Sequence, residues 1–443
     1  MKLLAPTLLI LAATLIHGCS RGTPVAEINA PEDAGDELET FVADLQDWAS
    51  WRGPHGNNTA STPAAPVKWS EAENVVWSSP IPGRGHASPI VVGDQVMLAT
   101  ASEESEQQLV VSFDRTTGEE NWRRVIHEGA FTPQRKMHAK STHANGTICC
   151  DDQHLFVAFL NGAKIIASAV DFSGEIVWQQ ELGAFESRFG YAPSPTLYKS
   201  FVLFAADNKG GGYLAALHRR TGDIVWRKAR GQFDSYSSPI VATINGKDQL
   251  LISGDRQVNS YDPTSGELNW SAPGTAKATC GTPVWNDELV FASGGYPERQ
   301  TLAVRADGSG DVVWSNSTKV YEPSLLLVDD ALYAVTDDGI AYCWDAATGK
   351  THWKKRLGGA FSSSPLCCDG RIYVSNLSGV THVFEASTDG LRLIAKNQLG
   401  SDAYATPTIC DGRIYLRVGV RQGDGRQEML YCVGKDALEI GTL

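Results

Sequence analysis

The chain is short of positive charge and of long apolar runs, and each shortage argues against a class of protein. Its 443 residues contain 38 Lys and Arg against 51 Asp and Glu, a formal net charge of −13. Nucleic-acid binding needs clustered Lys and Arg to meet phosphates, so this balance argues against it. The longest uncharged apolar run, residues 3–16, is too short to cross a membrane as a helix.

Local signatures of catalysis are missing as well. The chain has no Gly-x-Ser-x-Gly elbow, no His-Glu-x-x-His motif and no Walker loop. His127, His138 and His143 share one long insertion that also carries Lys and Arg, and we expect a solvated loop there rather than a metal site. What the chain has in excess is Trp, with 12 residues, beside 43 Gly. An excess of Trp points to an internal repeat.

The N-terminus is typical of an exported protein. Lys2 precedes an apolar run that ends in Ile16-His17-Gly18-Cys19, which predicts a signal peptide at 1–18. This ending resembles the bacterial lipobox, although His17 departs from the small residue usual there. The resemblance implies that Cys19 is lipidated and anchors the protein to a membrane without spanning it. The alternative is ordinary cleavage that leaves a free Cys19.

One short element, roughly Asp-x-x-Thr/Ser-Gly-x-x-x-Trp, recurs along the chain at intervals of 39 to 56 residues. Its glycines are Gly118, Gly174, Gly222, Gly266, Gly310 and Gly349, and its tryptophans are Trp122, Trp178, Trp226, Trp270, Trp314 and Trp353. A seventh copy has Gly390 and puts Ile394 in the Trp position. The Asp and Gly favour a turn, so the element predicts a corner followed by a strand whose Trp packs against the neighbouring unit.

Each repeat is expected to form one blade of a propeller. Two short stretches of alternating apolar residues precede each corner, which gives about four strands per unit. Four-stranded antiparallel units at this spacing are typical of propeller blades. Trp77 lies in a strand without a corner, and the C-terminal repeat has three strands and no corner. We therefore predict an all-β, eight-bladed β-propeller closed by this N-terminal strand, with an open solenoid as the alternative.

The repeat resembles the PQQ-like (pyrrolo-quinoline quinone) repeat of bacterial quinoprotein and BamB-like propellers, within the wider WD40/YVTN-like superfamily. The resemblance covers about residues 67–434. WD-type and kelch blades fit less well, because Trp344-Asp345 and Gly85-His86 each occur once and the glycine doublets share no register.

Four segments are expected along the chain. They are the signal peptide at 1–18, a leader at 19–66, the propeller at 67–434 and a tail at 435–443. The leader begins as an acidic tether and ends in a Trp-Arg-Gly-Pro motif. Between them, the spacing of five apolar residues predicts a short helix packed on the propeller. These residues are Leu38, Phe41, Val42, Leu45 and Trp48.

Eight cysteines follow Cys19, and several recur at equivalent places in the repeat. They are Cys149, Cys150, Cys280, Cys343, Cys367, Cys368, Cys410 and Cys432. Repeat-equivalent cysteines favour small buried strand residues over a bridged framework.

The resemblance implies two classes of function. Quinoprotein dehydrogenases of the family hold PQQ and Ca²⁺ in the channel, and the alcohol dehydrogenases among them place a bridged pair of adjacent Cys above the quinone. This chain offers two adjacent pairs, Cys149-Cys150 and Cys367-Cys368, but both precede turns inside blades. The paired Asp residues at 151–152, 329–330 and 337–338 fit hairpin turns better than calcium ligands. We therefore expect no catalytic residues, metal or cofactor.

Residues just ahead of each blade's first strand are candidates for a channel rim. Aligning the blades on Ser-Pro or its equivalent gives His86, His143, Tyr191 or Ala192, Tyr236, Cys280, Tyr321, Ser362 and Tyr404. Such a polar and aromatic rim suits a ligand. The alternative is that these side chains merely plug the entrance.

The sequence thus predicts a binding or assembly scaffold in the bacterial cell envelope, in the periplasm or on the outer membrane. We expect a monomer that binds a protein partner, contacts the membrane only through a lipid anchor and binds no nucleic acid. A quinoprotein dehydrogenase that oxidises alcohols or sugars is the alternative.

Overall fold

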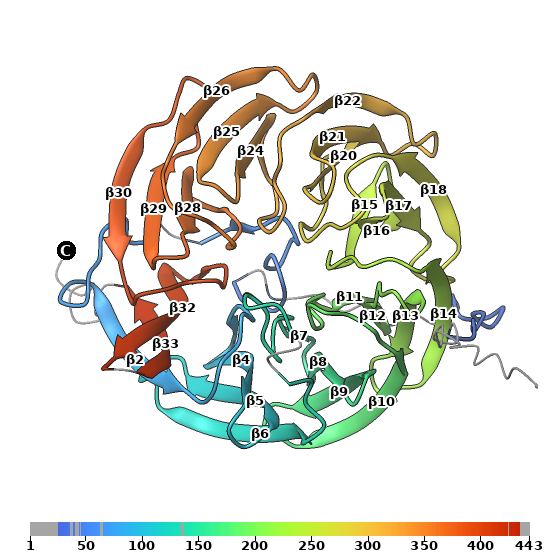
Figure 1. The fold of residues 1–443 in the computed structure, drawn as a ribbon, viewed down its shortest axis with the longest axis horizontal. Helices are drawn as coiled ribbons and strands as arrows, with labels where there is room; N and C mark the ends of the chain where they lie inside the picture. The colour runs from blue at the N-terminus through green and yellow to red at the C-terminus, as the bar shows by residue number, and fades with distance from the viewer. Residues whose placement is uncertain are drawn as a thin grey trace, which may run out of the picture.

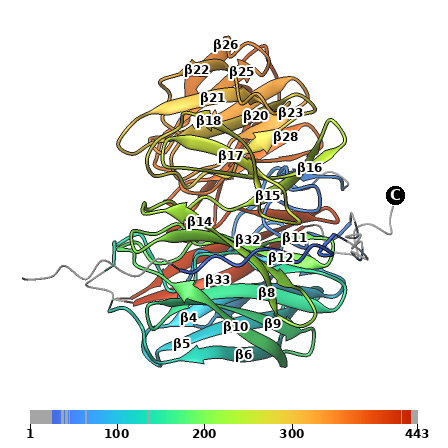
Figure 2. The ribbon, with the colours of Figure 1, turned by 90° about the vertical axis from the view of Figure 1, so that its right-hand side faces the viewer.

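Eight sheets stand in a ring in the computed structural model, each built on four antiparallel strands, and one of them carries a fifth, parallel strand (Figure 1). The structure describes residues 25–35, 39, 44, 46–62, 65–133, 137–423 and 425–434. Cys19, the predicted signal peptide and the predicted tail lie outside these ranges. Figure 2 shows the ring from the side, with β6 and β26 at opposite ends of the view. The predicted all-β, eight-bladed propeller is confirmed.

The first four blades follow one another along the chain. Blade 1 contains β3 (Ile90–Val92), β4 (Gln95–Ser102), β5 (Gln107–Asp114) and β6 (Glu120–Glu128). Blade 2 contains β7 (Cys149–Cys150), β8 (His154–Asn161), β9 (Lys164–Asp171) and β10 (Ile176–Ala184). Blade 3 contains β11 (Thr196–Tyr198), β12 (Phe201–Ala205), β13 (Gly212–His218) and β14 (Ile224–Gly231). Blade 4 contains β15 (Ile240–Ile244), β16 (Lys247–Gly254), β17 (Gln257–Tyr261) and β18 (Leu268–Pro273).

The other four blades complete the ring. Blade 5 contains β19 (Val284–Trp285), β20 (Leu289–Gly294), β21 (Gln300–Arg305) and β22 (Val312–Asn316). Blade 6 contains β23 (Leu326–Val328), β24 (Ala331–Val335), β25 (Ile340–Asp345) and β26 (Thr351–Arg356). Blade 7 contains β27 (Leu366–Cys368), β28 (Arg371–Ser375), β29 (Val380–Glu385) and β30 (Leu393–Gln398), with β1 (Thr59–Ala60) added in parallel to β27. Blade 8 contains β31 (Thr408–Cys410), β32 (Arg413–Gln422), β33 (Gly425–Val433) and β2 (Val75–Ile81).

The ring closes through β2, as the sequence predicts. This strand pairs antiparallel with β33, with Trp77 opposite Cys432 and Ser79 opposite Leu430. The buried Arg417 of β32 also fastens blade 8 to blade 1, because its guanidinium donates to the carbonyls of Ala87 and Ala99. The N-terminal strand therefore covers the outer edge of β33 and completes the four strands of blade 8.

The repeated tryptophans join neighbouring blades. Trp226 of blade 3 is fully buried, and a Cβ at Gly266 of blade 4 would lie 2.6 Å from its ring. Gly266 has φ +72°, which permits the corner and leaves room for the indole. The Trp226 indole N–H also donates to the carbonyl of Pro263 at that corner.

The same contact recurs around the ring. Indole N–H groups donate to a carbonyl one or two residues past the end of the third strand in the next blade. The pairs are Trp77 with Arg115, Trp122 with Phe172, Trp178 with Arg219, Trp314 with Ala346 and Trp353 with Ser387. Blade 4 is linked to blade 5 through a second side chain. There Trp270 donates to Gln249 Oε1, and Gln249 Nε2 donates to the carbonyl of Ala306.

Residues 46–62, here named the channel segment, cross one end of the ring. Trp48 pairs with Val91 at β3, the carbonyl of Ala49 accepts from the N–H of Cys150, and β1 pairs with the end of β27. All three contacts lie at the C-terminal ends of first strands, and Figure 1 shows this blue segment at the centre of the ring. The channel segment therefore covers the end of the channel at which the first strands finish.

Arg52 holds the channel segment together. Its buried guanidinium donates to the carbonyls of Gly56, Asn57 and, in blade 6, Leu325. No helix, and so none able to cross a membrane, occurs in the part of the chain that the structure describes. Trp48, the last residue of the predicted helix, forms a β-bridge instead, because Val91 offers an unpaired backbone edge. The other four residues of that prediction lie outside the described ranges.

Replacing Trp226 with Ala should lower the free energy of unfolding by about 3–5 kcal/mol, because it leaves a large cavity between two blades. Urea denaturation followed by fluorescence measures this loss. Leu268→Ala on β18 is the control, since Leu268 is 55% exposed and should change stability by no more than about 0.5 kcal/mol. Equal effects from the two variants would contradict the proposed role of the indole.

Replacing Arg52 with Ala should loosen the channel segment while leaving the blades intact, because three carbonyls, two of them buried, lose their donor. Hydrogen exchange read by mass spectrometry should show faster exchange within residues 46–62 and unchanged protection in the blade strands. His55→Ala, at an exposed position of the same segment, should change neither. Uniform loss of protection across all blades would show that Arg52 supports the whole ring instead.

Candidate functional site

A central cavity of about 910 Å³ occupies the channel and is lined by all eight blades. Trp51 of the channel segment lines it, and its indole N–H donates to Thr282 Oγ1 at 2.9 Å. The other lining residues include those ahead of the first strands, such as His86, Tyr236 and Tyr404. Since the channel segment covers the opposite end, the cavity is a pocket with Trp51 at its base and one open mouth.

A ring of eight hydroxyls encircles the pocket, one from each blade. Its members are Ser88, Thr147, Ser194, Ser238, Thr282, Ser324, Ser364 and Thr406. In seven links the backbone N–H of one member donates to the hydroxyl of the next at 2.9–3.1 Å. Thr282 accepts from Trp51. Each hydroxyl that accepts in this way retains its own proton to donate.

Most residues of the predicted rim lie together around the central cavity. His86, Tyr236, Cys280, Tyr321, Ser362 and Tyr404 all line the cavity. In each blade the rim residue lies two residues before the ring hydroxyl. This position is Ala192 rather than Tyr191 in blade 3, and Glu322 rather than Tyr321 in blade 6. Tyr321 nevertheless lines the cavity beside Glu322.

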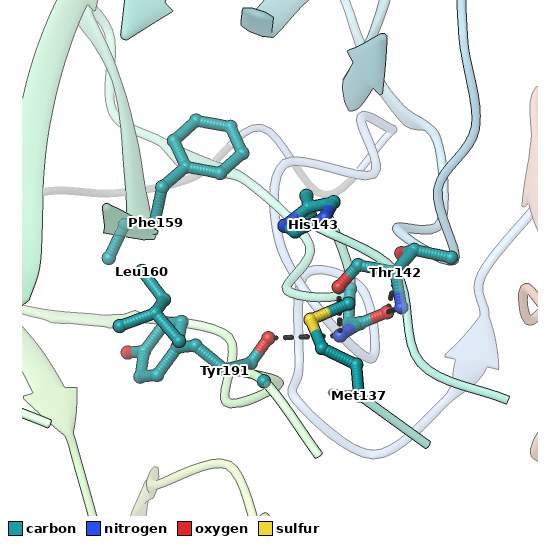
Figure 3. Close-up of a pocket in the computed structure, with 9 residues that line it drawn as sticks. Met137, Thr142, His143, Phe159, Leu160 and Tyr191 are labelled. Carbon is teal, nitrogen blue, oxygen red and sulfur yellow. Dashed lines mark hydrogen bonds between the residues drawn. The ribbon is translucent and has the colours of Figure 1, made fainter. Parts of the chain in front are cut away.

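His143 lies off this surface. It stacks on Phe131 with ring centroids 4.1 Å apart and borders a separate cavity of about 10 Å³, with Phe159 and Tyr191 (Figure 3). Such a space holds at most one water molecule. Asn145 lines the central cavity instead. The rim position of blade 2 is therefore two residues later in the chain than the sequence alignment of the blades predicted. His143 is therefore a packing residue of the insertion.

Burial favours the neutral forms of three rim residues, His86, Tyr236 and Cys280. Burial, followed by the charges of Arg84 and Arg417, lowers the pKa of His86 well below its usual value. Its imidazole stacks on Tyr404 with centroids 4.2 Å apart. Burial also raises the pKa of the Tyr236 hydroxyl and of the Cys280 thiol. The charge of the pocket therefore comes from its Lys, Arg, Asp and Glu residues.

The basic side chains at the mouth of the pocket were not predicted from the sequence. Lys140, Arg188, Lys209, Lys277 and Lys319 line the cavity, against three carboxylates at Asp234, Glu322 and Asp337. Lys277 and Lys319 share one repeat position, five residues before the ring hydroxyls Thr282 and Ser324, but the other six blades carry no Lys or Arg there, so the repeat as a whole does not mark the cations. The ring hydroxyls did leave a signal, since most of them precede a Pro at the start of a blade.

The three carboxylates of the cavity are already engaged. Glu322 pairs with Lys140 at 2.7 Å, and Asp234 pairs with Lys209 at 3.0 Å. Asp337 accepts from the backbone N–H groups of Tyr321 and Glu322, and burial raises the pKa of its carboxyl. Among the described residues, no three His, Cys, Asp or Glu side chains gather as a metal site would require.

The adjacent cysteines lie in strands rather than over the channel. Cys149-Cys150 forms β7 and Cys367-Cys368 ends β27, and all four are free buried thiols. Consecutive strand residues point to opposite faces, so the two members of each pair pack in different core clusters. Neither pair lines the central cavity. These residues do not fit a bridged pair above a quinone.

The architecture defines the chain as a β-propeller of PQQ-like repeats with one open-mouthed central pocket. A family model described as outer membrane protein assembly factor BamB matches residues 106–355 and, in a second match, 298–398. Together these matches span more than half of the chain. The chain therefore belongs to this BamB family.

Solved structures share the fold at low sequence identity. BamB from Moraxella catarrhalis is 17% identical with a TM-score of 0.59, over 81% of this chain and 99% of that one. Quinohemoprotein alcohol dehydrogenase from Comamonas testosteroni is 13% identical with a TM-score of 0.65, over 89% of this chain and 82% of that one. No curated protein sequence matches the chain. These likenesses show the propeller fold and do not separate scaffold from enzyme.

Native protein should react with a small thiol reagent at Cys280 before any of the seven other described cysteines, because those seven are buried. After unfolding without reductant, all eight should react, since each is a free thiol. Peptide mapping by mass spectrometry reads both results, and Cys280→Ser should abolish the early labelling. A peptide from native protein that contains Cys149-Cys150 or Cys367-Cys368 and is lighter than the dithiol form by two hydrogens would reveal a disulfide and contradict the assignment of buried free thiols.

Proposed function

We propose that the protein is a non-enzymatic binding or assembly scaffold of the bacterial cell envelope. The observation that carries this proposal is the chemistry of the central pocket. Hydroxyls, lysines and tyrosines line it, while its three carboxylates are occupied by lysines or by backbone N–H groups. Membership of the BamB family supports the same proposal.

The proposal includes where the protein is held. Export by residues 1–18 and a lipid on Cys19 would anchor it at the periplasmic or outer-membrane surface as a monomer. Val25, six residues beyond Cys19, contacts Gly183 of blade 2, and Ile28 pairs with Arg227 on the outer strand of blade 3. At roughly 3.4 Å per residue, a lipid on Cys19 would keep this edge within about 20 Å of the membrane. The protein would then meet partners with its remaining blades and its pocket mouth.

A quinoprotein dehydrogenase is the competing function, because the fold is shared with such enzymes. PQQ bound with Ca²⁺ would supply two-electron oxidation of an alcohol or sugar. The donor set of the pocket and the placement of the cysteine pairs speak against that arrangement. We propose that the protein uses no cofactor.

Purified protein mixed with PQQ and Ca²⁺ should show neither quinone binding by absorbance nor dye-linked oxidation of alcohols or sugars. In parallel, tagged protein should enrich a defined envelope protein from detergent-solubilised membranes, relative to a tag-only control. Turnover that depends on PQQ would overturn the scaffold function in favour of the enzyme. Failure to enrich any envelope protein would count against a scaffold as well.

A further inference from the structure

The open mouth of the pocket carries exposed aromatic side chains. Tyr296 is 66% exposed and Phe189 is 40% exposed, and both line the central cavity. Phe189 packs edge-on against Tyr236, with ring centroids 5.7 Å apart. Exposed aromatic residues around a concave site are typical of protein interaction surfaces.

The mouth is positively charged, although the whole chain has a formal charge of −13. Lys140 and Lys209 are paired with carboxylates, but Arg188 and Lys277 have no ion pair among the described residues. Lys319 lies over the ring of Tyr321 at 5.6 Å and near the backbone-bonded Asp337. Three cations are therefore available to an incoming anion.

The pocket walls add hydrogen-bond donors beneath these cations. The ring hydroxyls that line the cavity, such as Ser194 and Ser364, accept from backbone N–H groups and keep their own protons. A carboxylate that enters the mouth would therefore meet cations first and O–H donors deeper in the channel. Anions bind best where charge and oriented donors coincide.

We propose that this mouth is the docking site for an acidic segment of a partner protein, inserted end-on into the pocket. The proposal rests on the scaffold function above and names the chemistry of its partner. A protein segment suits the site better than a small molecule, because the cavity is open at one end and lies at the upper end of small-ligand volumes. Exposed Tyr296 and Phe189 would pack against apolar residues that flank the acidic ones.

Charge reversal at the mouth tests the proposal. Fluorescein-labelled hexaglutamate should bind the wild type, more weakly as salt is raised, while labelled hexalysine should not bind. The double variant Lys277→Glu and Lys319→Glu should weaken hexaglutamate binding on the order of tenfold or more. Fluorescence anisotropy measures both. No binding of hexaglutamate to the wild type would overturn the proposal.

A matched control removes the effect of net charge. Lys247→Glu with Lys355→Glu makes the same change in total charge at exposed positions of β16 and β26 that do not line the cavity. This variant should bind hexaglutamate within about twofold of the wild type. Equal weakening by the two variants would contradict a site at the mouth. Should the mouth variant fail to fold by circular dichroism, Lys277→Gln with Lys319→Gln should give a smaller loss in the same direction.

Envelope capture with the same variants separates this proposal from the scaffold function. Loss of the captured partner from the mouth variant, but not from the control variant, supports both. Capture that is equal for both variants keeps the scaffold function and overturns the mouth as its docking site. Absence of any partner even for the wild type counts against the scaffold function itself.

Discussion

The contact between one Trp and the corner of the next blade is the interaction on which the ring depends. A propeller blade has little core of its own, because each sheet is covered only by its two neighbours. The buried indole of Trp226 fills the space above Gly266 and satisfies the carbonyl of Pro263, so one side chain supplies both packing and a hydrogen bond. Between blades 4 and 5, Gln249 makes the link, since it accepts from Trp270 and donates to the carbonyl of Ala306. The ring of hydroxyls also joins neighbouring blades, at the channel, through hydrogen bonds from the backbone N–H of one blade to the hydroxyl of the next.

Closure of the ring and closure of one end of the channel together determine where a ligand can enter. Strand β2 seals the circle, and the channel segment seals one end of the channel through Arg52 and Trp51. The remaining opening is formed by loops, which are free to differ between blades without disturbing the repeat. A rigid ring with one variable, charged mouth is the arrangement expected of a binding module.

The repeat made the architecture predictable from sequence, whereas the site was only partly so. Gly four residues before Trp is a local signal that recurs every 39 to 56 residues, and the strand around Trp77 together with the three-stranded C-terminal repeat indicated the eighth blade and the closure of the ring. The rim was found where Ser-Pro set the register, but His143 was misplaced where an insertion precedes Gly146-Thr147. Lys277 and Lys319 were not predicted, because they occupy an equivalent loop position in only two of the eight blades. The channel segment is held by Trp51 and Arg52 through contacts with residues far away in the sequence, and no local sequence pattern predicts such contacts.

A partner that enters the pocket through its open mouth must pass Tyr296, which lines the cavity and is exposed. A photo-crosslinking amino acid placed at Tyr296, at the mouth, can be compared in intact envelopes with one at Leu268, on the outer strand of blade 4; both positions are exposed. We expect position 296 to crosslink to an acidic peptide of one envelope protein and position 268 to give no such crosslink. Crosslinks to a partner from position 268 alone would contradict entry through the mouth.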